Sequence, residues 1–337
     1  MSARMAIGRE VAPALRLGFL GLGWIGRKRL DAIATLPEVH VAALVDSDAQ
    51  RLESAQRHYG DALASDDVAA LLDCDLDGVV IATPNGCHAQ QAIACLSQGL
   101  PVFCQKPLAT NAPDAARVVA AARMANRLLG VDFCYRQVRG MGELRQRIAA
   151  GQLGKIAAID LTFHNAYGPD KRWCFDRSLA GGGCLLDLGI HLIDLALWLR
   201  GSQSMTLVSR DLFAQGRAIG ADQLEDLAFA EFRQSDGAIV RLACSWHAHM
   251  GRDAVIELQI LGSEGGAAWR NVNGSFYDFE LQVYRGTSRE QLGGFPDEWG
   301  GRALQAWVRR LAVDRSYDPQ CFEFVRSAQL IDAVYGQ

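Results

Sequence analysis

The sequence lacks an uninterrupted apolar run of the roughly 20 residues that a transmembrane helix requires. Residues 1–14 mix Arg and Glu with small residues, and they lack the apolar segment of a secretory signal. The first strand-like run begins only at Leu15. We therefore expect a loose leader at 1–14, no membrane partner and a cytoplasmic location.

Positive charge is not in excess, because 34 Lys and Arg residues face 38 Asp and Glu residues, a net charge of −4. Binding to nucleic acid depends on clustered positive charge, so we expect no nucleic-acid partner. Glycine and proline, at 34 and 9 of 337 residues, are too few for a disordered chain. At about 150 residues per domain, the length favours two domains.

Paired cysteines are also missing, because none of the nine cysteines belongs to a C-x-x-C motif. An odd number with scattered spacing favours reduced thiols over a disulfide framework or a zinc site. His247 and His249 share one face of an expected strand and are the one weak metal candidate. Two histidines alone are more often surface or packing residues, so we expect no metal.

Between Leu15 and Cys134, short apolar runs alternate with helical patterns. The expected strands are 15–20, 39–45, 78–82, 101–104 and 128–133. The expected helices lie near 25–35, 49–59, 88–98 and 114–126. This alternation predicts a parallel sheet covered on both faces.

After Tyr135 most strands follow one another without helices between them. The expected strands are 156–163, 205–212, 227–233, 238–246, 255–261 and 279–284. The expected helices lie near 142–150, 185–199, 299–312 and 321–335. Consecutive strands predict an antiparallel sheet that is open on one side. The expected fold is an α/β nucleotide-binding domain at 15–135 followed by an α+β domain at 136–337.

Residues 21–26, GLGWIG, form a G-x-G-x-x-G motif between an expected strand and an expected helix. The first glycine permits a tight turn, the second lets the backbone approach a pyrophosphate, and the third lets helix and strand pack closely. Asp46 follows the last glycine by 20 residues, where a carboxylate accepts hydrogen bonds from a ribose. The cofactor residues expected from this motif are Gly21, Gly23, Trp24, Ile25, Gly26 and Asp46.

Asp46 also indicates which dinucleotide binds, because its carboxylate repels a 2′-phosphate. Ser47 and Asp48 follow it, so no basic residue directly after Asp46 offsets that repulsion. Arg27 and Lys28, after the glycine motif, are cations that could offset it. The sequence favours NAD over NADP.

Polar residues follow two neighbouring expected strands, Thr83-Pro84-Asn85-Gly86-Cys87-His88 after one and Gln105-Lys106-Pro107 after the next. Ligands of open α/β sheets bind outside the carboxyl ends of their strands. One interpretation of Lys106 is a solvated charge on the protein surface. Its place at a strand end favours a lysine that faces a crevice.

A glycine-rich turn at 181–183 leads into a helical pattern that carries Asp187, His191 and Asp194. Their i, i+4, i+7 spacing places all three on one helix face. Since buried polar groups need partners, a histidine between two carboxylates is a candidate site residue. The alternative is a satisfied core histidine with an aspartate that caps the helix.

Taken together, these segments resemble the Gfo/Idh/MocA family (glucose–fructose oxidoreductase, inositol dehydrogenase, rhizopine catabolism) of NAD(P)-dependent oxidoreductases. The matching segments are GLGWIG at 21–26, VVIATPNGCHAQQAI at 79–93, KP at 106–107 and GGGCLLDLGIHLIDLALWL at 181–199. The resemblance implies a Rossmann domain and a second domain with a large open, mostly antiparallel sheet. The outer face of that sheet often forms an oligomer interface, which implies a homodimer or homotetramer.

The resemblance also implies site residues. Lys106 matches the family's active-site lysine, and Asp187, Gly189, His191 and Asp194 match its D-x-G-x-H-x-x-D signature. Further cofactor contacts are implied for Thr83, Pro84, Asn85, His88, Gln105 and Lys106, and substrate contacts for Tyr135, Arg136, Asp187 and His191.

Gln105 departs from the family, which usually has Glu before the lysine. The neutral side chain removes a carboxylate that would favour the charged form of Lys106. We expect Gln105→Glu to keep the fold and to shift the pH profile of turnover.

The expected activity is hydride transfer from a ring hydroxyl of a sugar, sugar derivative or cyclic polyol to NAD. His191 is the expected base, Lys106 stabilises the developing alkoxide, and Asp187 orients the substrate or His191. The family also allows Lys106 to be the base. Two alternatives stay open: glycosidase-type chemistry through transient oxidation, and a catalytically silent NAD(H)-binding regulator.

Overall fold

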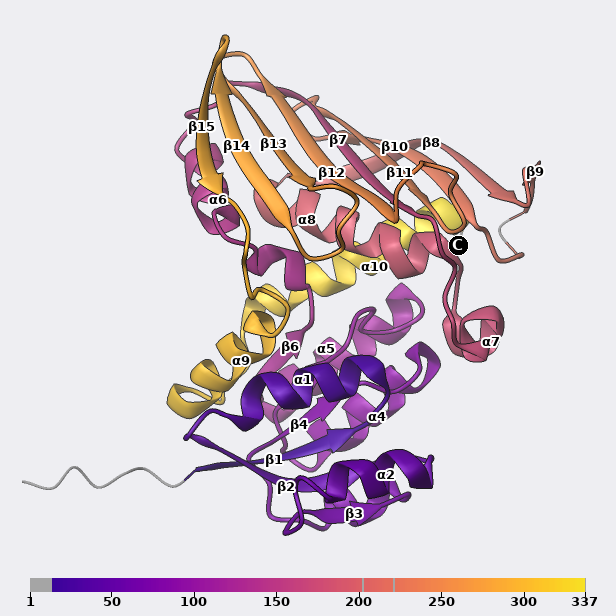
Figure 1. The fold of residues 1–337 in the computed structure, drawn as a ribbon, viewed down its shortest axis with the longest axis vertical. Helices are drawn as coiled ribbons and strands as arrows, with labels where there is room; N and C mark the ends of the chain where they lie inside the picture. Colours follow the sequence, from indigo (N-terminus) through magenta and orange to yellow (C-terminus); the bar gives the residue numbers. More distant parts are fainter. Residues whose placement is uncertain (1–13, 202, 221, 337) are drawn as a thin grey trace, which may run out of the picture.

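The computed structural model describes residues 14–201, 203–220 and 222–336. The leader expected at 1–14 therefore lies outside the described residues, except for Ala14. Two β-sheets form separate layers with helices between them (Figure 1). This arrangement confirms the predicted fold class.

The first sheet has six strands, all parallel, in the order β3-β2-β1-β4-β5-β6. Its strands are β1(Leu15–Leu20), β2(Val39–Val45), β3(Leu63–Ser65), β4(Gly78–Ile81), β5(Val102–Cys104) and β6(Leu129–Val131). Its helices are α1(Trp24–Ala34), α2(Ala49–Gln56), α3(Val68–Leu72), α4(Asn85–Ser97) and α5(Ala112–Ala125). In this order the chain reverses direction across the sheet between β1 and β4, which is where such sheets bind dinucleotides.

The five predicted strands and four predicted helices of this half are present, with ends that differ by a few residues. The unbroken apolar run Val79-Val80-Ile81 is fully buried, as expected for a strand covered on both sides. The short elements β3 and α3 were not predicted. Three and five residues are too few to show a hydrophobic period.

The second sheet has nine strands in the order β15-β14-β13-β12-β7-β11-β10-β8-β9, and every pair except β7–β11 is antiparallel. Its strands are β7(Ile156–Asn165), β8(Met205–Ala214), β9(Arg217–Ala218), β10(Leu227–Gln234), β11(Ile239–Ser245), β12(Ala254–Gly262), β13(Gly266–Asn271), β14(Phe279–Arg285) and β15(Ser288–Gly293). The prediction missed β9, β13 and β15. The small residues of β13 and the charged residues of β15 hide their alternation.

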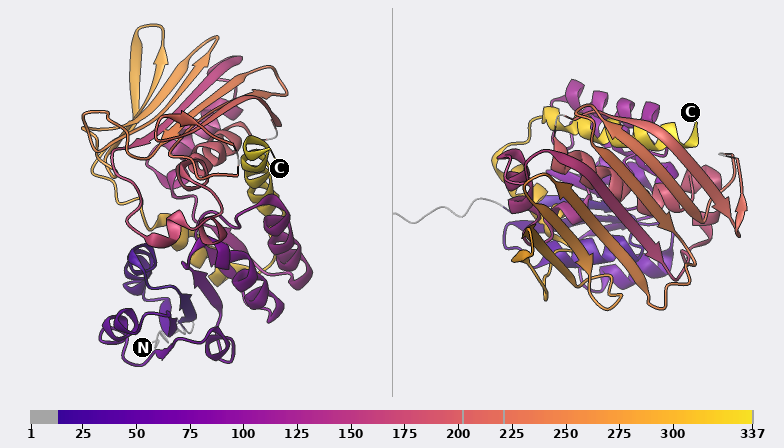
Figure 2. Two further views of the ribbon diagram at one scale, coloured as in Figure 1. Left: turned by 90° about the vertical axis from the view of Figure 1, so that its right-hand side faces the viewer. Right: turned by 90° about the horizontal axis from the view of Figure 1, so that it is seen from above.

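One face of the second sheet packs on helices and the other is open (Figure 2). The alternation along β10 shows this, because Ala228 and Phe232 are buried while Phe229 is 42% exposed. The remaining helices are α6(Met141–Ala149), α7(Arg177–Ala180), α8(Ile190–Arg200), α9(Arg302–Val313) and α10(Phe322–Tyr335). Short helical turns lie at η1(Cys134–Gln137), η2(Arg172–Phe175), η3(Leu185–Gly189) and η4(Pro319–Cys321).

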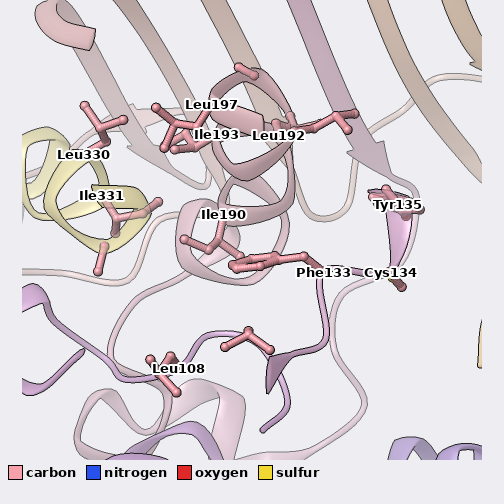
Figure 3. Close-up of a cluster of buried hydrophobic side chains, with 14 of the residues drawn as sticks. Leu108, Phe133, Cys134, Tyr135, Ile190, Leu192, Ile193, Leu197, Leu330 and Ile331 are labelled. Carbon is pink, nitrogen blue, oxygen red and sulfur yellow. The ribbon is translucent and has the colours of Figure 1, made fainter. Parts of the chain in front are cut away.

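Helix α8 lies in the hydrophobic core between the two sheets (Figure 3). Its residues Ile190, Leu192 and Ile193 are at most 2% exposed, and they belong to one cluster with Ile331 of α10 and Leu108. By length and composition the segment Arg177–Arg200 is one helix of the described chain that could cross a membrane, yet 89% of its apolar window is buried inside the protein. This segment is therefore a core helix of this fold.

Helix α9 returns to the parallel sheet after the second sheet is complete. Trp307 of α9 joins Phe103 of β5 in a cluster, with ring centroids 5.9 Å apart. A Cβ atom at Gly78 or Gly130 would lie 2.7 or 2.6 Å from the Trp307 ring, so both positions leave room for the indole. The residues after 136 are thus not confined to the second sheet, and the division into domains at 15–135 and 136–337 stays a prediction.

Gly130→Ala is expected to lower the free energy of unfolding by about 1–3 kcal/mol, because the added methyl group overpacks the Trp307 site. Urea unfolding of the purified protein measures the change. Gly142→Ala makes the same chemical change at a helical position with no atom within 4 Å, and it should cost nothing. Equal stability of the two variants would mean that α9 does not seat Trp307 against β6.

Candidate active site

The glycine motif forms the turn between β1 and α1. Gly21 has a φ of +90°, and a Cβ there would lie 2.5 Å from the Ala82 carbonyl oxygen. A Cβ at Gly26 would collide with the carbonyl of Gly21. Both positions therefore require glycine for the tight turn and for the close approach of helix and strand.

Gly23 differs from these two, because its φ of −61° is ordinary and a Cβ there would meet only the Arg51 guanidinium, at 3.9 Å. Its backbone faces open space. No side chain caps the N-terminus of α1, so the first-turn N–H groups at Trp24 and Ile25 are available to an anion. An open backbone beside an uncapped helix N-terminus fits the pyrophosphate of a dinucleotide.

Asp46 stands at the carboxyl end of β2 and is 7% exposed. Its Oδ2 accepts a hydrogen bond from Leu22 N at 2.6 Å, and its Oδ1 accepts one from Asp48 N at 2.9 Å. Asp46 thus fixes the glycine turn relative to the next turn. The sequence analysis missed Arg51, whose Nη1 lies 3.7 Å from Asp46 Oδ1, although its place in the first turn of α2 was a usable signal.

His88 lies on α4 and is 1% exposed. Its Nδ1 is 2.7 Å from the Pro107 carbonyl oxygen, and its Nε2 is 2.8 Å from the Thr83 carbonyl oxygen. Burial lowers the pKa of His88, and a neutral ring donates to only one of these oxygens. The side chain therefore links the segments that follow β4 and β5, and Asn85 adds a bond from its Nδ2 to the Ala180 carbonyl at 3.0 Å.

The side chain of Gln105 points toward Asp132, contrary to its expected place beside the Lys106 amine. Its Nε2 donates to Asp132 Oδ2 at 2.5 Å, and Arg29 Nε donates to the same oxygen at 2.5 Å. All three side chains are buried, with one negative and one positive charge among them. Gln105 thus anchors the strand end that carries Lys106. Asp132 and Arg29 lie far from Gln105 in sequence, and no sequence signal linked them.

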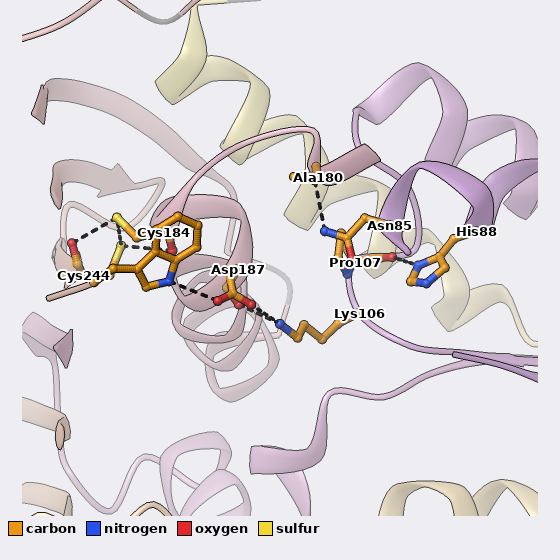
Figure 4. A network of polar contacts seen from close by, with 9 residues as sticks. Asn85, His88, Lys106, Pro107, Ala180, Cys184, Asp187 and Cys244 are labelled. Carbon is orange, nitrogen blue, oxygen red and sulfur yellow. Dashed lines mark hydrogen bonds and ion pairs between the residues drawn. The ribbon is translucent and has the colours of Figure 1, made fainter. Parts of the chain in front are cut away.

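Lys106 meets Asp187, which comes from the second part of the chain (Figure 4). Its Nζ donates to Asp187 Oδ1 at 2.7 Å and to the Asp187 backbone oxygen at 2.8 Å. Trp246 Nε1 donates to Asp187 Oδ2 at 3.1 Å. The Lys106 side chain is 20% exposed and that of Asp187 38%, so this ion pair is accessible from solvent.

The segment that carries Asp187 is fixed by the buried residue Glu225. The Glu225 carboxylate accepts hydrogen bonds from Gly183 N at 3.2 Å, Leu185 N at 2.8 Å and the Tyr335 hydroxyl at 2.9 Å. Burial raises the pKa of Glu225. Glu225 therefore holds the turn after the three glycines in a fixed position.

His191 is 9% exposed, and its buried Nδ1 has no hydrogen-bond partner. The expectation that it lies between two carboxylates was wrong. Asp187 lies in a π-helical turn and pairs with Lys106, whereas Asp194 pairs with Arg136, so the regular i, i+4, i+7 stripe is broken. Burial, then the positive charges of Lys106 and Arg29, lower the pKa of His191 well below its ordinary value.

Tyr135 and Arg136 follow β6 and have different surroundings. The Tyr135 ring centroid lies 5.0 Å from that of His191, and burial raises the pKa of its hydroxyl, with the Asp187 charge among the further causes. Arg136 instead binds both Asp194 oxygens, at 2.8 and 2.5 Å, and approaches Glu323 at 3.4 Å. The structure therefore brings Tyr135 to His191 but commits Arg136 to a buried network.

Among the described residues, no group of three or more His, Cys, Asp and Glu side chains is placed to hold a metal ion. His247 and His249 line a cleft of about 780 Å³ that also includes Trp246. The site that the structure assembles thus consists of Lys106, Asp187, His191 and Trp246, beside the carboxyl edge of a parallel sheet that carries the glycine turn.

Comparison with known proteins places this geometry in a family. Residues 15–133 match an oxidoreductase family with an NAD-binding Rossmann fold, and residues 141–268 match the GFO/IDH/MocA C-terminal domain. A protein of Amycolatopsis mediterranei, named as an oxidoreductase subunit, is 31% identical over 294 residues that cover 82% of this chain and 81% of the relative. Levoglucosan dehydrogenase of Pseudarthrobacter phenanthrenivorans is 27% identical over 86% of this chain and 81% of its own length.

Solved structures have the same fold. A levoglucosan dehydrogenase in complex with NADH and levoglucosan superposes with a TM-score of 0.82 at 24% identity, over 96% of both chains. A 3-ketoreductase from Actinomadura kijaniata in complex with NADP and TDP-benzene gives a TM-score of 0.82 at 22% identity, over 96% of this chain and 97% of its own. Both halves of the chain, their matches and the two-sheet fold therefore agree: the protein belongs to the Gfo/Idh/MocA family of NAD(P)-dependent oxidoreductases.

Proposed function

We propose that this protein oxidises a ring hydroxyl of a sugar, sugar derivative or cyclic polyol with NAD as the hydride acceptor. The observation that carries the proposal is the Lys106–Asp187 ion pair at the edge of the Rossmann sheet, with Nζ and Oδ1 2.7 Å apart and with Lys106 near enough for its charge to lower the pKa of His191. Relatives named for such substrates support it, including a myo-inositol 2-dehydrogenase of Thermotoga maritima at 27% identity and a D-glucoside 3-dehydrogenase of Escherichia coli at 26%.

In this proposal the protein side chains manage the proton and the developing charge. A bound nicotinamide dinucleotide supplies the acceptor for the hydride that leaves the carbinol carbon. His191 takes the hydroxyl proton, because its lowered pKa keeps the ring neutral near pH 7. Lys106 donates a hydrogen bond to the same oxygen as negative charge develops on it. Asp187 positions Lys106 and, through its exposed side, the substrate. The reverse assignment, with Lys106 as base, is the alternative that near-normal turnover of His191→Ala would favour.

The hypothesis of a catalytically silent regulator rested on Gln105 in place of the usual Glu. Because the Gln105 side chain contacts Asp132, this replacement does not face the substrate and no longer supports that hypothesis. Glycosidase-type chemistry differs in its products, since NADH would not accumulate.

We also propose a cytoplasmic location and a homodimer or homotetramer that forms through the open sheet face. The nine cysteines are all unpaired thiols, which suits a reducing compartment. Val208, Phe229 and Leu261 of the second sheet are 54%, 42% and 44% exposed, and a second copy would cover them.

NADH should bind more tightly than NADPH, because Asp46 accepts the ribose hydroxyls and repels a phosphate. Asp46→Asn should narrow the difference between the NADH and NADPH affinities. Arg51→Ala should widen that difference, because it removes the cation that lies 3.7 Å from the Asp46 carboxylate. Fluorescence titration with both dinucleotides measures the two affinities. Tighter binding of NADPH by the unaltered protein would overturn the assignment.

His191→Ala and Lys106→Ala should each lower turnover by roughly 10²-fold or more, the scale of general acid–base help. The double variant should lose less than the product of the two, because the residues act on one oxygen. NADH affinity should hardly change. Asp194→Asn is the control on the same helix, and it should reduce stability through the Arg136 pair rather than turnover. Near-normal turnover of His191→Ala would refute this mechanism, and loss of folding would make His191 a structural residue.

The pKa of His191 gives a second measure of the same arrangement. Since the positive charge of Lys106 lowers this pKa, Lys106→Met should raise it toward the ordinary value, although burial still holds it down. The imidazole stays neutral at pH values above its pKa, so the acidic limb of its titration should move to higher pH. NMR titration of the ring protons detects the shift, and Lys155→Met, at an exposed site, is the control. An unchanged pKa would mean that the two groups do not interact.

In Gln105→Glu, the introduced carboxylate should lie against Asp132. Two carboxylates would meet where Gln105 Nε2 and Asp132 Oδ2 are 2.5 Å apart, so stability should fall by about 1–3 kcal/mol near pH 7. The loss should shrink as the pH falls, because the pair then shares a proton and regains the hydrogen bond. Gln105→Met loses the donor without adding a charge, so its cost should not vary with pH. Urea unfolding across pH tests both variants, and a pH-independent loss in Gln105→Glu would contradict this geometry.

A further inference from the structure

The cleft of about 780 Å³ adjoins the candidate active site and is not used by the mechanism above. Trp246 belongs to both places, because its ring lines the cleft while its Nε1 donates to Asp187 at 3.1 Å. A group attached to a sugar at the Lys106–Asp187 pair would therefore extend toward this cleft. Ligand pockets in proteins commonly measure about 300–1,000 Å³, and this one is large enough for a ring beyond the one that reacts.

The lining of the cleft suits a flat, largely apolar group. Phe175 faces Trp246 with ring centroids 6.2 Å apart and an interplanar angle of 62°, and Met250 and Ala248 add apolar surface. Phe175 is 55% exposed and lines the cleft, so part of its ring is open to a ligand there. Aromatic side chains offer broad faces on which another ring can pack.

Polar groups at the rim offer hydrogen bonds without a fixed charge. His247 and His249 are exposed, and neither imidazole has a hydrogen-bond partner within residues 14–201, 203–220 and 222–336. His247 has a φ of +57°, and strained backbone of this kind clusters at binding sites.

The charge of the cleft disfavours one large class of sugar derivatives. Among the described residues that line it, none is Lys or Arg, and the partly exposed Asp226 is acidic. A sugar nucleotide would place a diphosphate there, and diphosphates require cationic or N–H donors. The cleft therefore disfavours an anionic extension.

We infer that the cleft binds the uncharged second ring of a glycoside, packed against the exposed Phe175 ring beside Trp246, while the first ring is oxidised at Lys106, Asp187 and His191. This inference rests on the proposed function and narrows its substrate from free sugars to glycosides. The second ring can be an aromatic group or another sugar, and both offer an apolar face.

The test compares turnover of four compounds in the gluco, galacto and manno series: the methyl glycoside, the 4-nitrophenyl glycoside, a disaccharide and the UDP-sugar. We expect kcat/KM for the 4-nitrophenyl glycoside or the disaccharide to exceed that of the methyl glycoside by about tenfold, a difference of 1.4 kcal/mol in apparent binding. The better of the two identifies the kind of second ring. Equal kcat/KM values for the methyl glycoside, the 4-nitrophenyl glycoside and the disaccharide would overturn the inference and leave the proposed function intact. A higher kcat/KM for the UDP-sugar would do the same.

Two matched variants locate the effect. Phe175→Ala should remove most of the gain in kcat/KM that the second ring gives over the methyl glycoside, without changing turnover of the methyl glycoside itself. Ala248→Trp should do the same by filling the cleft. Phe322→Ala is the control, because Phe322 is equally exposed, at 56%, but lies on α10 outside the cleft. An advantage that persists in both Phe175→Ala and Ala248→Trp would place the second ring elsewhere.

Calorimetric titration with the 4-nitrophenyl glycosides provides a readout that does not depend on turnover. Binding that weakens in Phe175→Ala but not in Phe322→Ala supports the cleft even if no sugar is oxidised, in which case the proposed function alone fails. Absence of measurable binding to the NADH-loaded protein would overturn the inference.

Discussion

The ion pair between Lys106 and Asp187 joins the two layers of the protein at the point where chemistry is expected, and much of the surrounding structure holds its two ends in place. On the Rossmann side, Gln105 anchors the strand end to Asp132 and Arg29, and His88 ties the Pro107 backbone to Thr83. On the other side, Glu225 binds the backbone of the turn that presents Asp187. Each anchor is buried, so each is costly to leave unpaired and is therefore rigid.

This arrangement separates two kinds of polar residue that look alike in a sequence. Asp187 and Asp194 lie seven positions apart, yet the first is accessible and faces Lys106, while the second is 2% exposed and neutralises Arg136. His88 and His191 are both buried, but His88 contacts two carbonyl oxygens whereas Nδ1 of His191 has no partner. A buried polar atom without a partner is costly to keep, so Nδ1 of His191 indicates a residue that is retained for a role other than stability.

The fold and the cofactor turn could be predicted from the sequence because both depend on local patterns. Glycine spacing and apolar runs gave β1, α1 and β2 with nearly their observed ends, since the residues that matter are neighbours in the chain. The partners of Gln105 and His191 could not be predicted, because a π-helical turn changed the helical phase between Asp187 and His191, and contacts such as Gln105–Asp132 join separate strands. Arg51 differs from these, because its place in the first turn of a predicted helix, five residues after Asp46, could have indicated its approach to that carboxylate.

The return of α9 to the parallel sheet has a consequence for how the chain folds as it is synthesised. Residues 302–313 pack on Phe103, and Trp307 among them lies against Gly78 and Gly130, yet they leave the ribosome after the whole second sheet. Until then, the part of the Rossmann sheet around Phe103 remains uncovered, and uncovered apolar surface promotes aggregation of partly folded chains. Completion of the first layer therefore waits for α9, and the two layers reach their native state together although they are encoded one after the other.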